Sequence, residues 1–269
     1  MKLSAITSII FICIIHLSCS QPSPTGSSLE KAESSLFEIL PADISGLDFN
    51  NLVTEDQNHN YFQYPYIYNG GGVAVGDINN DGLPDLYFTG NMVSDELYVN
   101  RGNLLFKKIT LNAGIRDATD SWNTGVLMWD ANADGKLDIY VCRSGNDNLG
   151  KNRRNLLYIN KGGESFEESA ESFGLDDSGF STQAYPFDFD NDGDLDLYLV
   201  NHRIDFIKNS VFDFEDDKII EFDSSDRLYR NNGDNTFTDV SQSAGIQNKS
   251  WGLSASIGDI NNDGWLDLY

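Results

Sequence analysis

The sequence predicts an all-β protein, a β-propeller of four-stranded blades of which about three and a half are present. Three observations carry this prediction: a nine-residue acidic loop occurs four times, strand-forming residues flank each copy, and a second turn motif follows three copies. The loops begin at Asp77, Asp130, Asp188 and Asp259, so successive copies lie 53, 58 and 71 residues apart. Those lengths suit a four-stranded blade, whereas a parallel β-helix needs shorter rungs and a sandwich does not repeat in this way.

The acidic loops have the residue types and spacing of a calcium site. Side-chain oxygens stand at positions 1, 3, 5 and 9, and Gly at position 6 permits a sharp turn. Position 7 varies, as expected where a backbone carbonyl is the ligand, and Ca²⁺ takes about six to eight such oxygens. The expected ligands are, loop by loop, Asp77, Asn79, Asp81 and Asp85; Asp130, Asn132, Asp134 and Asp138; Asp188, Asp190, Asp192 and Asp196; Asp259, Asn261, Asp263 and Asp267.

Three other interpretations of these loops are a solvated turn, an EF-hand and a tandem calcium nonapeptide array. The long spacing between copies excludes the array. A run of Asn, Asp and Gly can be a solvated turn, but four copies with one spacing argue against that. An EF-hand needs Glu at position 12 and flanking helices, whereas position 12 here is Phe88, Val141 or Leu199 in a run of strand-forming residues. The loop at Asp188 has a carboxylate, Asp190, where the others have Asn, so we expect it to bind calcium most tightly and the others near ~10⁻⁴–10⁻³ M.

Each predicted blade places its first two strands on either side of the acidic loop. First strands are expected at 73–76, 126–129, 185–187 and 254–258, and second strands at 86–88, 139–141 and 197–200. Third strands at 97–102, 157–162 and 228–233 carry Leu-Tyr followed by Asn and Gly, which favour a hairpin turn before fourth strands that begin at Phe106, Phe166 and Phe237. The amphipathic spacing over 164–173 predicts one short helix.

The N-terminus has the composition of an export signal. Residues 1–18 combine Lys2 with an apolar run from Ile6 to Leu17 that is too short to span a bilayer as a mature helix, which predicts a signal peptide. Cys19 and the Pro-, Ser- and Gly-rich tract behind it resemble a bacterial lipoprotein signal, although His16 stands where such signals usually carry Leu. We expect residues 19–35 to be a lipidated, flexible tether and residues 36–269 the propeller, on the outer membrane or cell surface, with plain secretion as the alternative.

Charge and cysteine content argue against a nucleic-acid partner and against stabilisation by a set of disulfide bonds. The net charge is −24, from 42 acidic and 18 basic residues. Four calcium ions would leave about −16, so no nucleic-acid partner is expected, because phosphate contacts need a basic surface. Once the signal is removed only Cys19 and Cys142 remain, so bound calcium, rather than a set of disulfide bonds, is expected to stabilise the fold. Cys142 follows strand residues and is expected to be buried rather than nucleophilic.

The acidic loops resemble the FG-GAP and VCBS-type repeats of integrin alpha-subunit propellers and of secreted bacterial proteins. The order of the 69–77 segment, the Leu-Tyr-x-Asn motif and Ala-Gly-Ile at 113–115 and 244–246 is similar to propellers of the cartilage acidic protein type. The resemblance covers roughly residues 36–269 and implies calcium binding by the matching loop residues. The Phe-Gly and Gly-Ala-Pro pairs of that repeat are mostly replaced, with Phe173-Gly174 similar to the first. Members usually have about seven blades, so we expect a fragment of a longer protein, or two copies that complete a ring.

Binding is expected on the face opposite the calcium loops. Strand parity places the loops and the Asn-Gly hairpins on one face, and the segments 143–155 and 201–227 on the other. The first segment carries Arg143, Lys151, Arg153 and Arg154, and the second carries His202, Arg203 and Lys208. Variable loops on a rigid scaffold commonly bind partners, so we expect a cell-surface or secreted binding or adhesion module for a protein or glycan ligand.

An enzyme is the alternative, as the propeller portion of a secreted polysaccharide-degrading protein. The paired carboxylates that could act as acid and base are already assigned to the calcium loops. Only His59 and His202 remain after signal removal, and the sequence indicates no Ser/His/Asp set. We therefore expect no catalytic activity, while a purely structural surface protein stays open.

Overall fold

The structure is a computed structural model that describes residues 37–116, 121–145, 153–202, 225–246, 248 and 251–269. The chain divides into two units, Met1–Ile39 and Leu40–Tyr269. The predicted signal peptide, and the tether with Cys19, lie outside the described residues, so the fold below is that of the second unit. No helix among the described residues is both long and apolar enough to cross a membrane.

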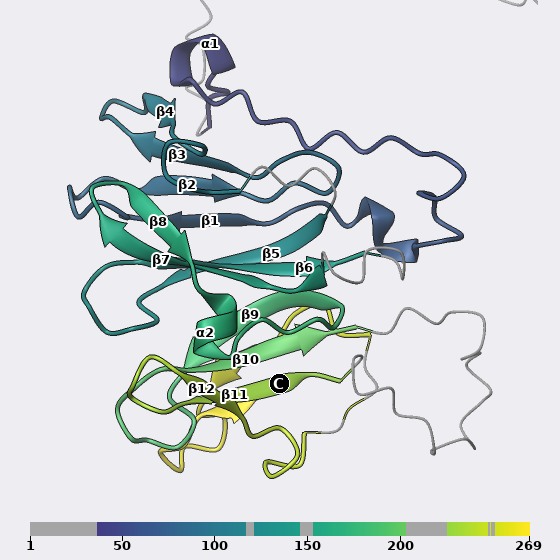
Figure 1. Cartoon of the computed structure of the whole chain (residues 1–269), viewed down its shortest axis with the longest axis vertical. Helices are drawn as coiled ribbons and strands as arrows, with labels where there is room; N and C mark the ends of the chain where they lie inside the picture. The colour runs from purple at the N-terminus through teal and green to yellow at the C-terminus, as the bar shows by residue number, and fades with distance from the viewer. Residues whose placement is uncertain (1–36, 117–120, 146–152, 203–224, 247, 249–250) are drawn as a thin grey trace, which may run out of the picture. The chain divides into compact units, whose positions relative to one another are not determined.

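Three four-stranded antiparallel sheets follow one another along the chain, and each is built from consecutive strands (Figure 1). They confirm the predicted all-β fold of propeller blades. Blade 1 contains β1 (Val73–Gly76), β2 (Asp85–Phe88), β3 (Glu96–Asn100) and β4 (Phe106–Lys108). Blade 2 contains β5 (Trp122–Trp129), β6 (Asp138–Ser144), β7 (Leu156–Gly162) and β8 (Ser165–Glu168). Blade 3 contains β9 (Ser181–Phe187), β10 (Asp196–Asn201), β11 (Arg227–Asn231) and β12 (Phe237–Asp239).

A fourth repeat begins with the short pair β13 (Ile257–Gly258) and β14 (Asp267–Leu268). Strands β5 and β9 start four residues earlier than the sequence predicts, and β13 is shorter than predicted. A β-bulge or irregularity separates Trp122 and Asn123 from the rest of β5, and another separates Ser181 from Gln183 in β9. A sequence pattern that requires regular alternation misses residues beyond such an irregularity.

The apolar core lies between successive blades. First strands of neighbouring blades, β1 with β5 and β5 with β9, lie side by side (Figure 1). Because side chains alternate between the two faces of a strand, one face of blade 2 packs on blade 1 and its other face packs on blade 3. Between blades 1 and 2 the core includes Tyr87, Leu97, Ile139 and Tyr158, each at most 1% exposed. A second cluster of the same kind joins blades 2 and 3.

The predicted helix over 164–173 is wrong over most of its length. Residues Ser165–Glu168 form β8, and the helix α2 covers only Ala170–Phe173. Strand β8 pairs with β7 through Phe166 opposite Asn160, so tertiary pairing overrides the local helical spacing. The other helical elements of the described chain are also one turn long, namely α1 (Ala42–Ser45) and the 3₁₀ helix η1 (Pro65–Tyr68).

Candidate functional site

The four aspartate loops, residues 77–85, 130–138, 188–196 and 259–267, share one backbone conformation. The carboxylate at position 1 accepts hydrogen bonds from the backbone nitrogens of positions 5 and 6. In the first loop these are 3.0 Å from Asp81 N and 2.7 Å from Gly82 N to Asp77. Gly82 has φ 84°, in the left-handed region that Gly adopts without a Cβ penalty. The same bonds recur in the other three loops.

In the first three loops, the position 9 aspartate ties the loop to the third strand of its blade. Asp85, Asp138 and Asp196 are fully buried. In Asp138, Oδ2 accepts from Ala131 N at 2.9 Å and Oδ1 accepts from Asn160 N at 2.7 Å, and equivalent bonds hold the other two. Burial raises the pKa of Asp138 and of Asp196 to about 6, and the other loop carboxylates nearby act in the same direction. These carboxylates are therefore held in place before any ion binds.

The third loop brings three carboxylates together. Asp188, Asp190 and Asp196 offer ligand oxygens that all lie within 4.8 Å of one another. Asp192 is outside this group, and its Oδ1 accepts a 3.1 Å bond from Asp194 N. The buried Oδ1 atom of Asp190 has no hydrogen-bond partner among the described residues. A buried carboxylate oxygen without a partner is costly, and a hard cation such as Ca²⁺ prefers oxygen ligands, so this cluster could hold a metal ion.

Asp194, at position 7 of the third loop, was not among the expected ligands. Its Oδ1 is also buried without a hydrogen-bond partner in the described part of the chain. Burial raises the pKa of Asp194, and the neighbouring Asp192 charge adds to the effect. The sequence signal was present, because the other loops carry Leu83, Lys136 and Trp265 at this position.

In the other three loops the position 3 asparagine turns its side-chain oxygen into the loop. Asn79, Asn132 and Asn261 each accept a bond from the backbone nitrogen of position 5, at 3.0, 3.1 and 2.9 Å. The position 5 aspartates accept from the position 7 nitrogen through Oδ1, at 2.9–3.0 Å. All expected ligand residues therefore lie in or beside the turn, and the third loop has the largest carboxylate cluster.

The loops and the Asn-Gly hairpins share a face, as strand parity predicts. In the hairpin of blade 1, Asn100 Oδ1 accepts from Gly102 N at 2.9 Å. Arg101 in that hairpin forms a 2.8 Å ion pair with Glu164 in the hairpin of blade 2. Asn80 Nδ2 in the first aspartate loop donates to Gly135 O in the second at 3.4 Å.

On the opposite face, a repeated polar contact that sequence reasoning missed joins each blade to the next. We call Asp95, Asn155 and Asp226, one residue before each third strand, the latch residues. Each bonds the tyrosine of the second strand, a backbone nitrogen near that strand's end, and a side chain of the next blade. For Asp95 these partners are Tyr87 OH at 2.8 Å, Gly90 N at 2.8 Å and Asn123 Nδ2 at 2.7 Å. A recurring Asp/Asn-x-Leu-Tyr-x-Asn pattern marks the three latch residues in the sequence, but it does not mark their partners.

The predicted basic cluster does not form as one exposed surface. Arg143 is 6% exposed and its Nε donates to Asn123 Oδ1 at 3.1 Å, so its prediction as a surface residue is wrong. Arg153 lies over the Phe180 ring at 4.2 Å, and Arg154 pairs with Asp176. The long side chain of Arg143 is needed inside the blade contact, and sequence composition cannot distinguish that role from an exposed one. Lys151 lies outside the described residues.

His202 was expected in a binding loop, but it is fully buried. Its Nε2 lies 2.8 Å from Ser144 Oγ and 3.3 Å from Tyr64 OH. Ser144 is also fully buried, so this Ser/His pair, which the sequence did not reveal, is closed to a substrate. The aromatic rings of Tyr66 and Phe180 pack on the imidazole, at centroid distances of 4.2 and 5.8 Å. Arg203 and Lys208 lie outside the described residues.

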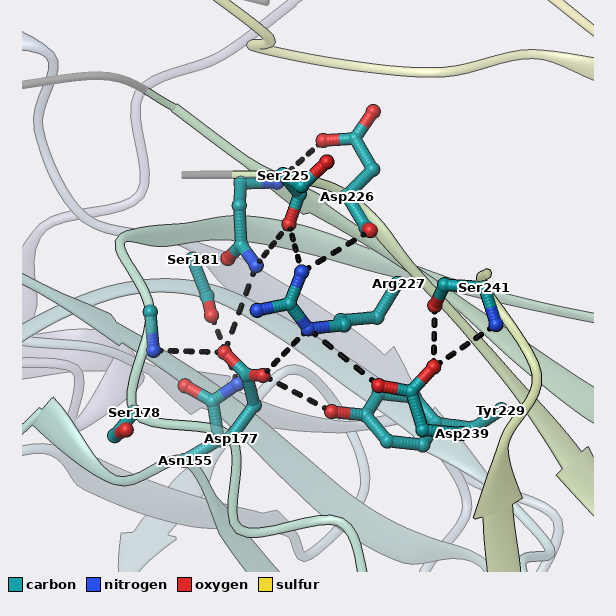
Figure 2. Close-up of polar contacts among 12 residues, drawn as sticks. Asn155, Asp177, Ser178, Ser181, Ser225, Asp226, Arg227, Tyr229, Asp239 and Ser241 are labelled. Carbon is teal, nitrogen blue, oxygen red and sulfur yellow. Dashed lines mark hydrogen bonds and ion pairs between the residues drawn. The ribbon is translucent and has the colours of Figure 1, made fainter. Parts of the chain in front are cut away.

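Arg227, at the end of the second variable segment, is also structural. Figure 2 shows its guanidinium between Asp177 and Asp239. The Nε atom is 3.3 Å from Asp177 Oδ2, and the two side chains are 3% and 8% exposed. Asp177 also accepts from Tyr229 OH at 3.0 Å and from Gly179 N at 2.7 Å. The linker that enters blade 3 is thus fixed by a buried ion pair.

Cys142 is a free, fully buried cysteine, as expected. Burial raises the pKa of its thiol well above the usual range, and the charge of Asp177 adds to the effect. A neutral, enclosed thiol is a packing residue.

Consecutive four-stranded sheets, each with an aspartate loop between its first two strands, define a β-propeller repeat protein. The FG-GAP-like repeat matches residues 77–141, 130–199 and 214–269, and the chain belongs to this family. This confirms the resemblance expected from the loop and hairpin motifs.

The chain is also similar to cartilage acidic protein 1 from several animals. It is 28% identical to the human protein over 206 residues, which cover 75% of this chain and 28% of the relative. The mouse protein is 28% identical over 203 residues, covering 74% and 28%, and the Xenopus tropicalis protein 33% identical over 135 residues, covering 50% and 20%. The chain therefore spans less than a third of the length of these relatives.

Proposed function

We propose that this protein is a calcium-stabilised binding or adhesion module, exported to the cell surface or secreted, that recognises a protein or glycan ligand on the face opposite the aspartate loops. The observation that carries the proposal is the cluster of Asp188, Asp190 and Asp196 at one end of rigid, closely packed blades. An ion there would neutralise the cluster and hold β9 to β10. The opposite end of the same strands is then free for recognition.

The proposed role of calcium is structural. The position 9 carboxylates are positioned by backbone donors before the ion arrives. An ion that binds only this folded arrangement raises stability by mass action. Each of the four loops would hold one ion with its own aspartates and, in three of the loops, its asparagine.

The enzyme alternative gains no support from the Ser144–His202 pair, because both side chains are fully buried. The loop carboxylates are held by backbone donors at the opposite end of the blades. Binding is therefore the function that the arrangement supports best.

Export and attachment are part of the proposal and rest on the sequence of residues 1–19. A lipid on Cys19 would place the binding face outside the cell on a tether. Metabolic labelling with a fatty acid should mark the wild-type protein and not a Cys19→Ala variant. A labelled Cys19→Ala protein would refute attachment at this residue.

Binding is tested with glycan arrays and with immobilised candidate proteins, in calcium and after chelation. The variant Arg154→Ala alters a 60% exposed side chain of the recognition face, and Arg101→Ala is its control on the loop face, at 39%. We expect a ligand whose binding requires calcium and falls in Arg154→Ala but not in Arg101→Ala. If binding of the ligand is lost only in Arg101→Ala, recognition lies on the loop face and the proposal is refuted.

A further inference from the structure

A pocket of about 390 Å³ lies where the first strands of the successive repeats begin. Tyr64, Tyr66 and the segment 69–72 enclose it from the approach to β1, and Trp122 and Gly125 enclose it from β5. Thr182 and Gln183 of β9 and Leu253 of the fourth repeat complete the lining. The first strands run from this pocket toward the aspartate loops, so the pocket belongs to the opposite face. Its volume is in the range of small-molecule sites.

The pocket is built from close backbone approaches that only glycine allows. A Cβ on Gly125 would lie 2.3 Å from Thr182 O, and one on Gly72 would lie 2.7 Å from Thr124 O. Thr124 Oγ1 donates to Ser181 O at 2.7 Å across the same junction. Three repeats are thereby fixed against one another, and the pocket is held open by the scaffold. A pre-formed site loses little conformational entropy when a ligand binds.

The described residues that line the pocket are uncharged, although 22% of the chain is charged. None of these lining residues is Asp, Glu, Lys, Arg or His, and His202 packs on the Tyr66 ring without being part of the lining. A charged ligand would lose its hydration without gaining an opposite charge, which is costly. This observation selects a neutral ligand.

The remaining groups are aromatic rings, carboxamides and backbone. Tyr64 and Trp122 form an edge-to-face pair at 5.4 Å, and the half-buried ring of Tyr66 lies beside them. Asn69 and Gln183 bring carboxamides, each with donors and an acceptor. A sugar ring has an apolar face of C–H groups that packs on an aromatic ring, and hydroxyl groups around its edge that pair with amides.

We propose that this pocket binds a neutral saccharide, one or two residues long, against Tyr66 with Asn69 at its edge. The proposal rests on the proposed function, since it gives the ligand class and the place on the recognition face. It requires neither the Ser144–His202 pair nor the basic side chains of that face.

The test is a calorimetric titration of the whole protein in calcium with methyl glycosides of glucose, galactose, mannose and xylose and with their neutral disaccharides. Galacturonate and glucosamine serve as charged probes of similar size. The variants are Tyr66→Ala and Asn69→Ala. The control is Tyr68→Ala, a tyrosine of the same 3₁₀ helix that is 65% exposed and does not line the pocket. Melting temperatures in calcium identify any variant that fails to fold.

We expect at least one neutral sugar to bind, with a loss of tenfold or more in Tyr66→Ala and in Asn69→Ala and no change in Tyr68→Ala. Preference for a charged probe, binding by no neutral sugar, or unchanged binding in a folded Tyr66→Ala and Asn69→Ala protein overturns the assignment. If a ligand found on the arrays depends on Arg154 but not on Tyr66, the proposed function stands and this pocket assignment fails. If no array or immobilised ligand binds either, both fail.

Discussion

The side-chain amide of Asn160 donates a 2.8 Å hydrogen bond to the carbonyl oxygen of Ile78, in the aspartate loop of the preceding blade. The same nitrogen donates to Leu137 O in its own blade at 3.0 Å. Ile78 N in turn donates to Asp85 Oδ2 at 3.0 Å. One buried asparagine therefore joins two aspartate loops, and the packing of the blades sets the positions of the carboxylates.

Replacing Asn160 with alanine should destabilise the protein by about 1–3 kcal/mol, because buried donors and acceptors are left without partners. Asn231→Ala is the matched control. Asn231 has the same place in blade 3 and bonds Leu195 O and Gly233 N, but among the described residues its side chain makes no hydrogen bond to the loop of a neighbouring blade. Urea unfolding in chelator should show the larger loss for Asn160→Ala. Equal losses would mean that the contact with Ile78 adds nothing.

The carboxylate at position 3 should set the order of calcium affinity. Asp190→Asn gives the third loop the residue that the other loops have, and Asn79→Asp makes the opposite exchange in the first loop. Because affinity rises with ligand charge, we expect roughly tenfold weaker binding at the third loop in Asp190→Asn and tighter binding at the first loop in Asn79→Asp. Calcium titration calorimetry measures both. Two variants with the affinities of the wild type would contradict this order.

The strands next to the repeated motifs could be predicted from sequence. The first strand was predicted at its observed bounds, Val73–Gly76, because apolar residues lead directly into Asp77 there. Local turn chemistry fixes these elements, since position 1 of the loop bonds nitrogens only four and five residues away. The aspartate turns were predictable for the same reason.

Contacts that depend on variable connections could not be predicted in this way. The tyrosine and latch residue are 8 residues apart in blade 1, 15 in blade 2 and 28 in blade 3, so no fixed spacing marks the pair. His202 was misassigned because its burial comes from aromatic rings far away in sequence, including Tyr64 at a separation of 138 residues. Burial of a polar side chain is a tertiary property, and residue type alone predicts exposure.

The latch residue Asp95 should make stability depend on pH. Burial raises the pKa of Asp95 above its ordinary value of 3.8, against the opposing effect of its hydrogen bonds. With a raised folded-state pKa, the stability gained by protonation is fully present below the unfolded pKa and is lost as pH rises through the folded pKa. Asp95→Asn removes this titration and supplies the residue that blade 2 has at Asn155.

We therefore expect wild-type stability relative to Asp95→Asn to increase as pH falls from 7 toward 4. Urea unfolding of both proteins in chelator, at several pH values, measures the difference and cancels the groups that they share. A difference that stays constant with pH, or that shrinks on acidification, would show that Asp95 keeps an ordinary pKa in the folded protein.

Two adjacent aspartates, Asp176 and Asp177, allow an exposed ion pair to be compared with a buried one. Asp177 pairs with Arg227 at 3.3 Å where both side chains are nearly inaccessible, whereas Asp176 pairs with Arg154, which is 60% exposed. Asp177→Ala removes the nearer of the two carboxylates beside the buried Arg227 charge, and Asp239 is farther away, at 3.7 Å, so the loss should be about 3 kcal/mol or more. Asp176→Ala should cost less than about 1 kcal/mol, because solvent screens an exposed pair. Chemical denaturation in 0.1 and about 1 M salt should show the Asp177 loss little changed by salt, and comparable losses for the two variants would refute the buried pair.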